Sequence, residues 1–240
     1  MGKRLISQRR GRGGPVWTAT KNGVAPAKYS DYNKFLNTPL IKGEVMELIN
    51  DPARSGVLIK TEFHDGTQEY SIGAEGLFVG QKVQCGVEAD LEIGNVKTLK
   101  SCVEGCPVFN IEKTPGDGGS LARTSGAYGL IVTKDKKAVY VKLPSGKVME
   151  INPACRATIG CSGAGGRKEK PFVKAGKKSI AMRARHKKYP SVRGIAMNAK
   201  DHPFGGSNHH PGKSKSTSRH AAAGRKVGDI ASSRTGRRKK

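Results

Sequence analysis

The sequence predicts a mainly β protein in which a neutral core lies between two long, irregular, basic extensions. Charge is the first observation, because residues 1–36 hold 8 Lys/Arg against 1 acid, residues 37–166 hold 14 against 15, and residues 167–240 hold 22 against 3. The second is that apolar residues in the middle stretch alternate with the period of two that is typical of strands. The third is that the last stretch shows no sustained period. Basic extensions of this kind indicate a polyanionic partner such as a nucleic acid.

The basic N-terminal extension, residues 1–36, has charge but no apolar segment behind it, so it is not expected to be a secretory signal. Its aromatic residues have two interpretations. Aromatic side chains among basic ones can stack on unpaired bases, or they can fasten the extension to the core. We expect the second role for Phe35, and both roles stay open for Trp17.

Residues 37–112 are expected to form a five-stranded barrel that resembles the OB fold. The expected strands are residues 41–49, 57–63, 67–72, 81–87 and 108–112. Alternation places Val57, Ile59, Thr61 and Phe63 on one face, and the Asp65-Gly66 dipeptide is typical of a hairpin turn. Glycines follow at short intervals, as in a strongly curved sheet, although this pattern alone also fits a sandwich.

Residues 113–166 are expected to hold a glycine-rich loop and a small SH3-like barrel. The strands are expected at residues 128–133, 138–143, 147–151 and 155–159, with Val139, Val141 and Leu143 on one face. Residues 113–126 contain three glycines within four positions, so their backbone N–H groups can approach phosphates closely. A flexible linker is the alternative interpretation of this loop.

In the basic C-terminal extension, residues 167–240, the sequence predicts a short helix at residues 180–188 and irregular chain beyond it. A segment rich in Gly and Arg with few apolar residues is expected to be disordered alone and to fold against RNA. No apolar run approaches the roughly 20 residues that span a bilayer. The protein is therefore expected to be intracellular, and a membrane-surface role is disfavoured because the extensions lack an apolar face.

Metal and cofactor sites are not expected. The five cysteines fit no common zinc spacing and are expected to be reduced thiols in small core positions. His209, His210 and His220 have no carboxylate or cysteine near them in the sequence that would complete a metal site.

Five ordered motifs carry a resemblance to a known family. They are DPARSG at 51–56, GNV at 94–96, KTPGDGGSLARTSGAY at 113–128, CRATIG at 155–160 and VRGIAMNAKDHPFGGSNHH at 192–210. Together they resemble the universal second protein of the large ribosomal subunit, of the archaeal and eukaryotic type. The resemblance runs from the N-terminal extension to the last residues.

The resemblance implies a structural constituent of the large ribosomal subunit in the cytoplasm, with no small-molecule substrate and no membrane partner. It implies binding to large-subunit ribosomal RNA in support of subunit assembly, subunit association and the peptidyl-transferase region. Neighbouring ribosomal proteins and the small subunit are further expected partners. Thr114 stands where the family usually has Lys, which shifts a phosphate contact to Lys113, and Ala199 stands where it usually has Pro.

The expected RNA-binding residues fall in three stretches, and the C-terminal stretch includes the segment 192–206, which resembles an extended segment of the family. They are Lys3, Arg4, Arg9, Arg10 and Arg12; Lys113, Gly116, Gly118, Gly119 and Arg123; and Arg193, Asn198, Asp201, His202, Gly205, Gly206, His209, His210, Lys213, Arg225, Lys226, Arg237 and Arg238.

Two alternative functions remain beside a structural RNA-binding role. A carboxylate next to a histidine can orient it as a general base, so Asp201-His202 suggests a ribosomal protein with a direct catalytic histidine. Sequence neighbours in an extended segment point apart, however, and no nucleophile or oxyanion donors are recognisable nearby. The other alternative, a general nucleic-acid packaging protein, needs neither a neutral core nor motif-bearing loops.

Overall fold

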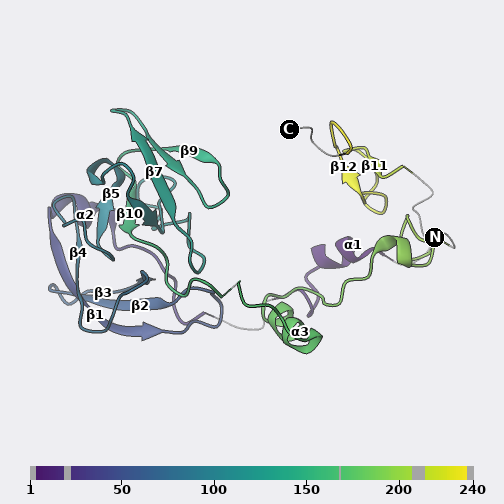
Figure 1. Cartoon of the computed structure of the whole chain (residues 1–240), viewed down its shortest axis with the longest axis horizontal. Coiled ribbons are helices and arrows are strands. Elements are labelled where there is room, and N and C mark those ends of the chain that lie inside the picture. Colours follow the sequence, from purple (N-terminus) through teal and green to yellow (C-terminus); the bar gives the residue numbers. More distant parts are fainter. Residues whose placement is uncertain (1–3, 19–22, 168, 207–213, 237–240) are drawn as a thin grey trace. The chain divides into compact units, whose positions relative to one another are not determined.

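A computed structural model describes residues 4–18, 23–167, 169–206 and 214–236, and these form two compact units. Residues within 21–171 form the first, here called the β unit. Residues within 1–20 and 172–240 form the second, here called the terminal unit, which therefore contains both ends of the chain. Figure 1 shows that most of the regular structure is strand, so the mainly β prediction is confirmed.

The β unit is built on one continuous ten-stranded sheet with the order β3-β2-β1-β4-β5-β10-β6-β7-β8-β9. Neighbouring strands are antiparallel except for β4 and β5, which are parallel. The strands are β1 Ile41–Ile49, β2 Leu58–Phe63, β3 Gln68–Ile72, β4 Lys82–Cys85, β5 Val96–Thr98, β6 Pro107–Phe109, β7 Gly129–Lys134, β8 Val139–Lys142, β9 Val148–Ile151 and β10 Arg156–Ile159.

The strongly alternating strands agree with the prediction. β1 has the predicted bounds, Ile59, Thr61 and Phe63 are buried, and Gly66 adopts a φ of +77° in the β2–β3 turn. The sequence did not predict β5, because three residues are too short for alternation to show. The expected strand 108–112 is displaced toward the N-terminus, since β6 ends at Phe109.

β10 lies at the junction of the two predicted barrels. Its sequence position suggested a strand of the second barrel, yet it pairs with β5 on one side and β6 on the other. All four of its residues are buried, as expected for a strand covered on both faces. The two halves of the sheet, with β1–β3 in one and β7–β9 in the other, are therefore joined through β10 (Figure 1).

Four apolar clusters fill the β unit. The largest contains Leu99, Val108, Ile111, Ile131, Val139, Val141 and Cys155, and a second packs Phe35 against Ile41, Phe63 and Cys85. The predicted role of Phe35 in fastening the extension to the core is thus confirmed. Phe35 belongs to helix α2 (Tyr32–Asn37), and Leu99 begins the short helix η1 (Leu99–Ser101). Cys85, Cys102 and Cys155 are buried and Cys106 and Cys161 are half-buried, all as free thiols.

The terminal unit has little regular structure. It contains α1 (Ile6–Gly11), α3 (Ala175–Ala184), η2 (Gly194–Ala196) and a two-stranded parallel pair of β11 (Ser216–Thr217) and β12 (Asp229–Ile230). The predicted helix 180–188 exists but begins at Ala175, and it ends early because His186 adopts a φ of +53°. Within the described residues, no helix has both the length and the apolar character needed to cross a bilayer.

Candidate nucleic-acid interface

The glycine-rich loop 113–126 is a folded element organised by one carboxylate. Asp117 accepts hydrogen bonds from the backbone N–H of Lys113 at 2.9 Å and of Gly119 at 2.8 Å, and from Oγ of Ser120 at 3.2 Å. Partial burial opposes ionisation, but these donors hold the pKa of Asp117 below its usual range. The loop therefore has one defined shape, unlike a flexible linker.

Gly118 and Gly119 are buried and adopt φ values of +82° and +94°, which favour glycine. The Gly118 N–H is donated to Oε1 of Glu112 at 3.1 Å and the Gly119 N–H to Asp117. The glycine-rich sequence predicts that these N–H groups face phosphate, whereas in the structure both are donated to carboxylates of the protein. Lys113 and Gly116 are the predicted contact residues of this loop that stay exposed.

A buried ion pair lies beneath the loop. Glu112 and Arg156 are at most 1% exposed, and Oε1 of Glu112 lies 2.8 Å from Nη2 of Arg156. The guanidinium is 5.1–5.3 Å from the ring centres of Tyr29, Tyr32 and Phe35. This contact fixes the segment that leads into the sheet against the loop. The sequence did not predict this ion pair, because 44 residues separate the two charges.

Two arginines from different loops bind the same stretch of backbone. Arg123 donates to the carbonyl oxygens of Ala27 at 2.6 Å and Gly119 at 2.8 Å, and Arg54 donates to that of Ala25 at 2.7 Å. Burial, and next the charge of Arg54, lower the pKa of Arg123. The charge of Arg54 is already paired within the protein, because its Nη1 lies 2.5 Å from Oδ2 of the buried Asp51. Arg54 was missed as a site residue, although its motif DPARSG had been recognised.

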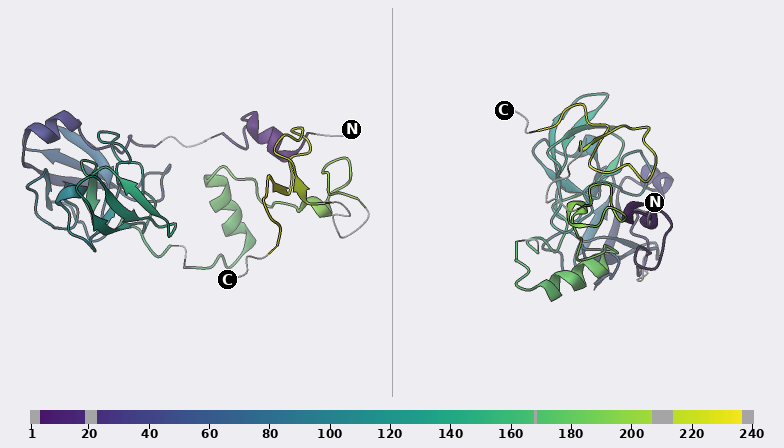
Figure 2. Two further views of the ribbon diagram at one scale, coloured as in Figure 1. Left: turned by 90° about the horizontal axis from the view of Figure 1, so that it is seen from above. Right: turned by 90° about the vertical axis from the view of Figure 1, so that its right-hand side faces the viewer.

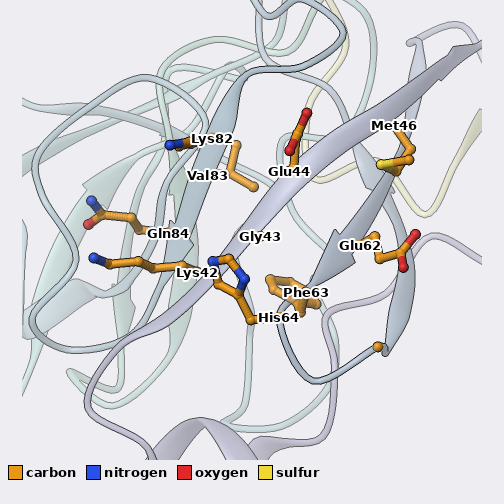
Figure 3. Close-up of a pocket in the computed structure, with 11 residues that line it drawn as sticks. Lys42, Gly43, Glu44, Met46, Glu62, Phe63, His64, Lys82, Val83 and Gln84 are labelled. Atoms are coloured by element: carbon orange, nitrogen blue, oxygen red, sulfur yellow. The ribbon is translucent and has the colours of Figure 1, made fainter.

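A groove of about 660 Å³ crosses the face formed by β1, β2 and β4. Figure 3 shows Lys42 and Lys82 on one side of it and Glu44 and Glu62 toward the other, with the Phe63 ring between. Both signs of charge line this groove. It therefore lacks the uniform positive character of a phosphate-binding surface.

The predicted N-terminal contact residues lie in the terminal unit. Arg4, Arg9, Arg10 and Arg12 are exposed, and the Arg10 guanidinium lies 4.8 Å from the ring centre of the half-buried Trp17. Trp17 thus has a cationic partner within its own extension. The interaction keeps the ring close to basic side chains, as base stacking beside phosphate contacts requires.

Residues 193–206 form a chain of tight turns. Backbone hydrogen bonds join the N–H of Asp201 to the carbonyl of Asn198 at 2.9 Å and the N–H of Gly205 to that of His202 at 2.9 Å. A Cβ at Gly205 would lie 2.3 Å from the Asn198 oxygen, so only glycine fits. The expectation of an extended segment is wrong here, because the glycines let the backbone fold onto itself.

His202 is held inside these turns. Its Nδ1 accepts the backbone N–H of Phe204 at 3.1 Å, and its ring lies 5.3 Å from the Phe204 ring and against Gly194. Burial lowers the pKa of His202. The neutral ring therefore carries its proton on Nε2 and presents a hydrogen-bond donor, while the Nδ1 lone pair is already engaged.

The remaining predicted residues divide between the terminal unit and the undescribed parts of the chain. Arg225 lies 6.0 Å from the Phe204 ring centre, whereas Arg193, Asn198 and Lys226 are exposed. Lys3, His209, His210, Lys213, Arg237 and Arg238 lie outside the described residues. The N-terminal arginines and the 193–226 residues, distant in sequence, are thus brought into one unit.

The terminal unit is rich in cations and poor in core. It holds 24 Lys/Arg against 2 acids, and among its described residues those buried are Leu5, Phe204 and Thr217. Helix α3 buries none of its side chains, and its Ile180 is 72% exposed. So few buried side chains cannot offset the conformational entropy of ordering such a chain. A cation-rich unit with so small a core indicates a polyanionic partner.

A β unit of nearly balanced charge, with 20 Lys/Arg against 17 acids, joined to a cation-rich, weakly packed unit defines an RNA-binding protein. Residues 2–85 match the family described as "Ribosomal Proteins L2, RNA binding N-terminal domain", and residues 92–225 match "Ribosomal Proteins L2, C-terminal domain". The chain belongs to the ribosomal protein L2 family, which confirms the resemblance noted in its motifs.

Relatives match over the full chain. The chain is 47% identical to the "Large ribosomal subunit protein uL2" of Methanothermobacter thermautotrophicus, with 100% of both proteins covered. It is 49% identical to the protein of the same name from Methanocaldococcus jannaschii, again over 100% of both. A Methanococcus maripaludis relative of that name is 49% identical over 99% of this chain and 100% of its own length.

Proposed function

We propose that this protein is a structural constituent of the large ribosomal subunit in the cytoplasm, and that it binds large-subunit ribosomal RNA through both units. The observation that carries the proposal is the terminal unit, which has 24 Lys/Arg against 2 acids and almost no core of its own. RNA phosphates both neutralise that charge and cover the exposed side chains. Membership of the L2 family supplies the identity of the RNA.

In this proposal the two units have different tasks. The β unit offers a folded surface in which loop 113–126 and Arg123 recognise the shape of the RNA. The terminal unit supplies electrostatic affinity and bridges RNA helices whose phosphates repel one another. By these contacts the protein supports subunit assembly, subunit association and the peptidyl-transferase region, where neighbouring ribosomal proteins and the small subunit are further partners.

The role of His202 in this proposal is binding. A general base needs a lone pair directed at its substrate, but Nδ1 of His202 accepts the Phe204 N–H. The Nε2–H is suited to a phosphate or base acceptor. We expect fully assembled particles with His202→Ala to form peptide bonds at the wild-type single-turnover rate, whereas a large loss of rate in intact particles would favour the catalytic alternative.

The main test measures how the affinity for large-subunit RNA depends on salt. Deleting residues 167–240 removes 22 Lys/Arg, so we expect weaker binding and a shallower slope of log affinity against log salt concentration. An unchanged slope would show that these cations do not contact phosphates. Co-sedimentation with the large subunit through a high-salt gradient separates this role from general packaging, because a packaging protein would spread over all nucleic acid.

Two matched triple variants test the same prediction without deleting any part of the chain. Lys177, Lys178 and Arg183 of α3 are exposed and are changed together to Gln. The control changes the exposed lysines of the β7–β8 and β8–β9 turns, Lys136, Lys137 and Lys147. Removing one lysine or arginine from a phosphate lowers the slope by roughly 0.7–0.9, so the α3 variant should have a slope shallower by about 2 while the control keeps the wild-type slope.

A further inference from the structure

Two adjoining hollows lie in the terminal unit where α1 meets the C-terminal extension. One has a volume of about 390 Å³, and its basic lining residues are Arg4, Arg9 and Lys188. The other has a volume of about 300 Å³ and includes Lys226 in its lining. Asp201 borders both hollows, and so do three apolar residues, Ile6, Val192 and Met197. Cavities of this size fall in the range of small-ligand sites.

Both ends of the chain are needed to form these hollows. Leu5, which is only 7% exposed, anchors the start of α1 beside residues 191–202 and 226–228. This packing brings Arg4 and Arg9 into the lining of the same hollow as Lys188. The C-terminal extension alone would supply Asp201 and Lys188 without the two arginines. In the left view of Figure 2, α1 overlaps the C-terminal segment between β11 and β12, and a Cβ on Gly224 of that segment would lie 3.9 Å from Nε2 of Gln8 in α1.

Asp201 is the feature that a simple phosphate site does not explain. It is the only acid that lines either hollow, and within the described residues no ion pair joins it to a basic side chain. A half-buried carboxylate beside three cations weakens the attraction for a bare anion. The Asp201 carboxylate favours binding only when the ligand places a hydrogen-bond donor next to its phosphate, because an ionised carboxylate can only accept hydrogen bonds.

We propose that this composite pocket receives one unstacked nucleotide of RNA, an inference that rests on the RNA-binding function proposed above. Arg4, Arg9 and Lys188 hold the phosphate, and Asp201 accepts the hydrogen bond of the adjacent ribose 2′-hydroxyl. The apolar side formed by Ile6, Val192 and Met197 packs against the sugar and base. The pocket therefore selects RNA over DNA, because only RNA carries the 2′-hydroxyl.

The ligand chemistry follows from which groups line the same hollows. In a nucleotide the ribose is bonded directly to the phosphate, so a carboxylate beside a phosphate cradle meets a sugar hydroxyl first. A free phosphate would leave the apolar side of the pocket unused. An acidic peptide would bring further carboxylates toward Asp201 and would be repelled there.

The test is analogue interference on large-subunit RNA bound to the full chain. RNA pools carry 2′-deoxynucleotides at random positions, and bound molecules are separated from unbound ones and mapped. Wild-type protein should show interference at specific positions, and Asp201→Ala should lose one of them while the others persist. The control is Asp229→Ala, because Asp229 is an exposed acid of β12 that lines neither hollow, and it should keep the wild-type pattern.

Two further variants separate the proposed interaction from misfolding. Asp201→Asn keeps an acceptor oxygen of the same shape, so it should retain the interference that Asp201→Ala loses. With phosphorothioate pools, Arg9→Ala should lose interference at or next to the same nucleotide. Arg219→Ala is the matched control, because Arg219 is exposed and lies outside both hollows, and it should keep the interference at that nucleotide.

The outcomes distinguish this inference from the proposed function. If wild type and Asp201→Ala give the same deoxy interference pattern while both bind tightly, the nucleotide pocket is refuted and the RNA-binding function stands. If the wild-type chain shows no selective binding to large-subunit RNA, the proposed function itself fails.

Discussion

Glu112→Gln should destabilise the β unit because it removes the charge partner of a buried guanidinium. Glu112 accepts four hydrogen bonds, from Gly118 N at 3.1 Å and from N, Nε and Nη2 of Arg156 at 2.8, 3.1 and 2.8 Å. Glutamine keeps nearly the same volume but replaces one acceptor oxygen by a donor and leaves Arg156 without a counter-charge. Breaking a buried pair from one side costs about 3–5 kcal/mol.

The expected loss lies near the lower end of that range, at about 3 kcal/mol. Three aromatic rings surround Arg156, and a desolvated cation–π interaction contributes up to about 2 kcal/mol. A loss of this size is a large fraction of the total stability of about 5–15 kcal/mol that is typical of a domain.

Urea unfolding of the full chain, followed by far-ultraviolet circular dichroism, measures this loss. Tryptophan fluorescence is unsuitable, because Trp17 lies in the terminal unit. Asp65→Asn is the control, since it breaks the solvent-exposed ion pair with Lys34 and should leave the midpoint nearly unchanged.

A double variant isolates the cause of the loss. Glu112→Leu combined with Arg156→Met removes both charges and should recover much of the stability, because apolar replacements of buried pairs are often neutral or stabilising. A loss below about 1 kcal/mol for Glu112→Gln, or no recovery in the double variant, would refute the reasoning that an unpaired buried charge is responsible.

Two further predictions concern the β unit. Burial raises the pKa of Glu69 from 4.5 to about 7, so the folded chain keeps a proton that the unfolded chain releases in that window. Stability should therefore fall by up to about 3 kcal/mol as pH rises from 4.5 to 7, and Glu69→Gln should flatten this dependence in urea titrations. Gly119→Ala should cost at least about 1–3 kcal/mol, since its Cβ would lie 2.7 Å from the Asn110 carbonyl oxygen at a φ of +94°. Gly105→Ala, at a φ of +81° in open space, should show only the backbone cost, and equal losses in the two variants would contradict the steric argument.

Local chemistry explains which elements could be predicted. The strands β1 to β3 carry clear alternation and a turn dipeptide, so their bounds follow from the sequence to within a residue. β5 was missed because it is short. The position of β10 between β5 and β6 was also missed, because pairing partners far apart in sequence leave no local pattern.

The candidate site shows the same division. Composition and motifs identified the basic ends and the glycine loop, and the family membership confirms the RNA-binding class that they indicated. The sequence could not predict the hydrogen-bond partners of individual groups. A donor such as the Gly118 N–H has many possible acceptors in the sequence, and only the fold places one of them beside it. The charge of Asp201 was visible in the sequence, while its position beside Arg4 and Arg9 depends on α1 meeting the C-terminal extension.

The sequence by itself determined the class of fold, the polyanionic partner and the family, because period, charge and motifs are properties of neighbouring residues. The tertiary structure decided which charges are buried, as at Glu112 and Arg156, and which gather on a surface. It also decided that the two ends of the chain form one unit. Residues 4–9 and 188–201 line the same hollow, although about 180 residues of chain lie between them. No local sequence pattern predicts a contact between segments so far apart, so only the fold reveals it.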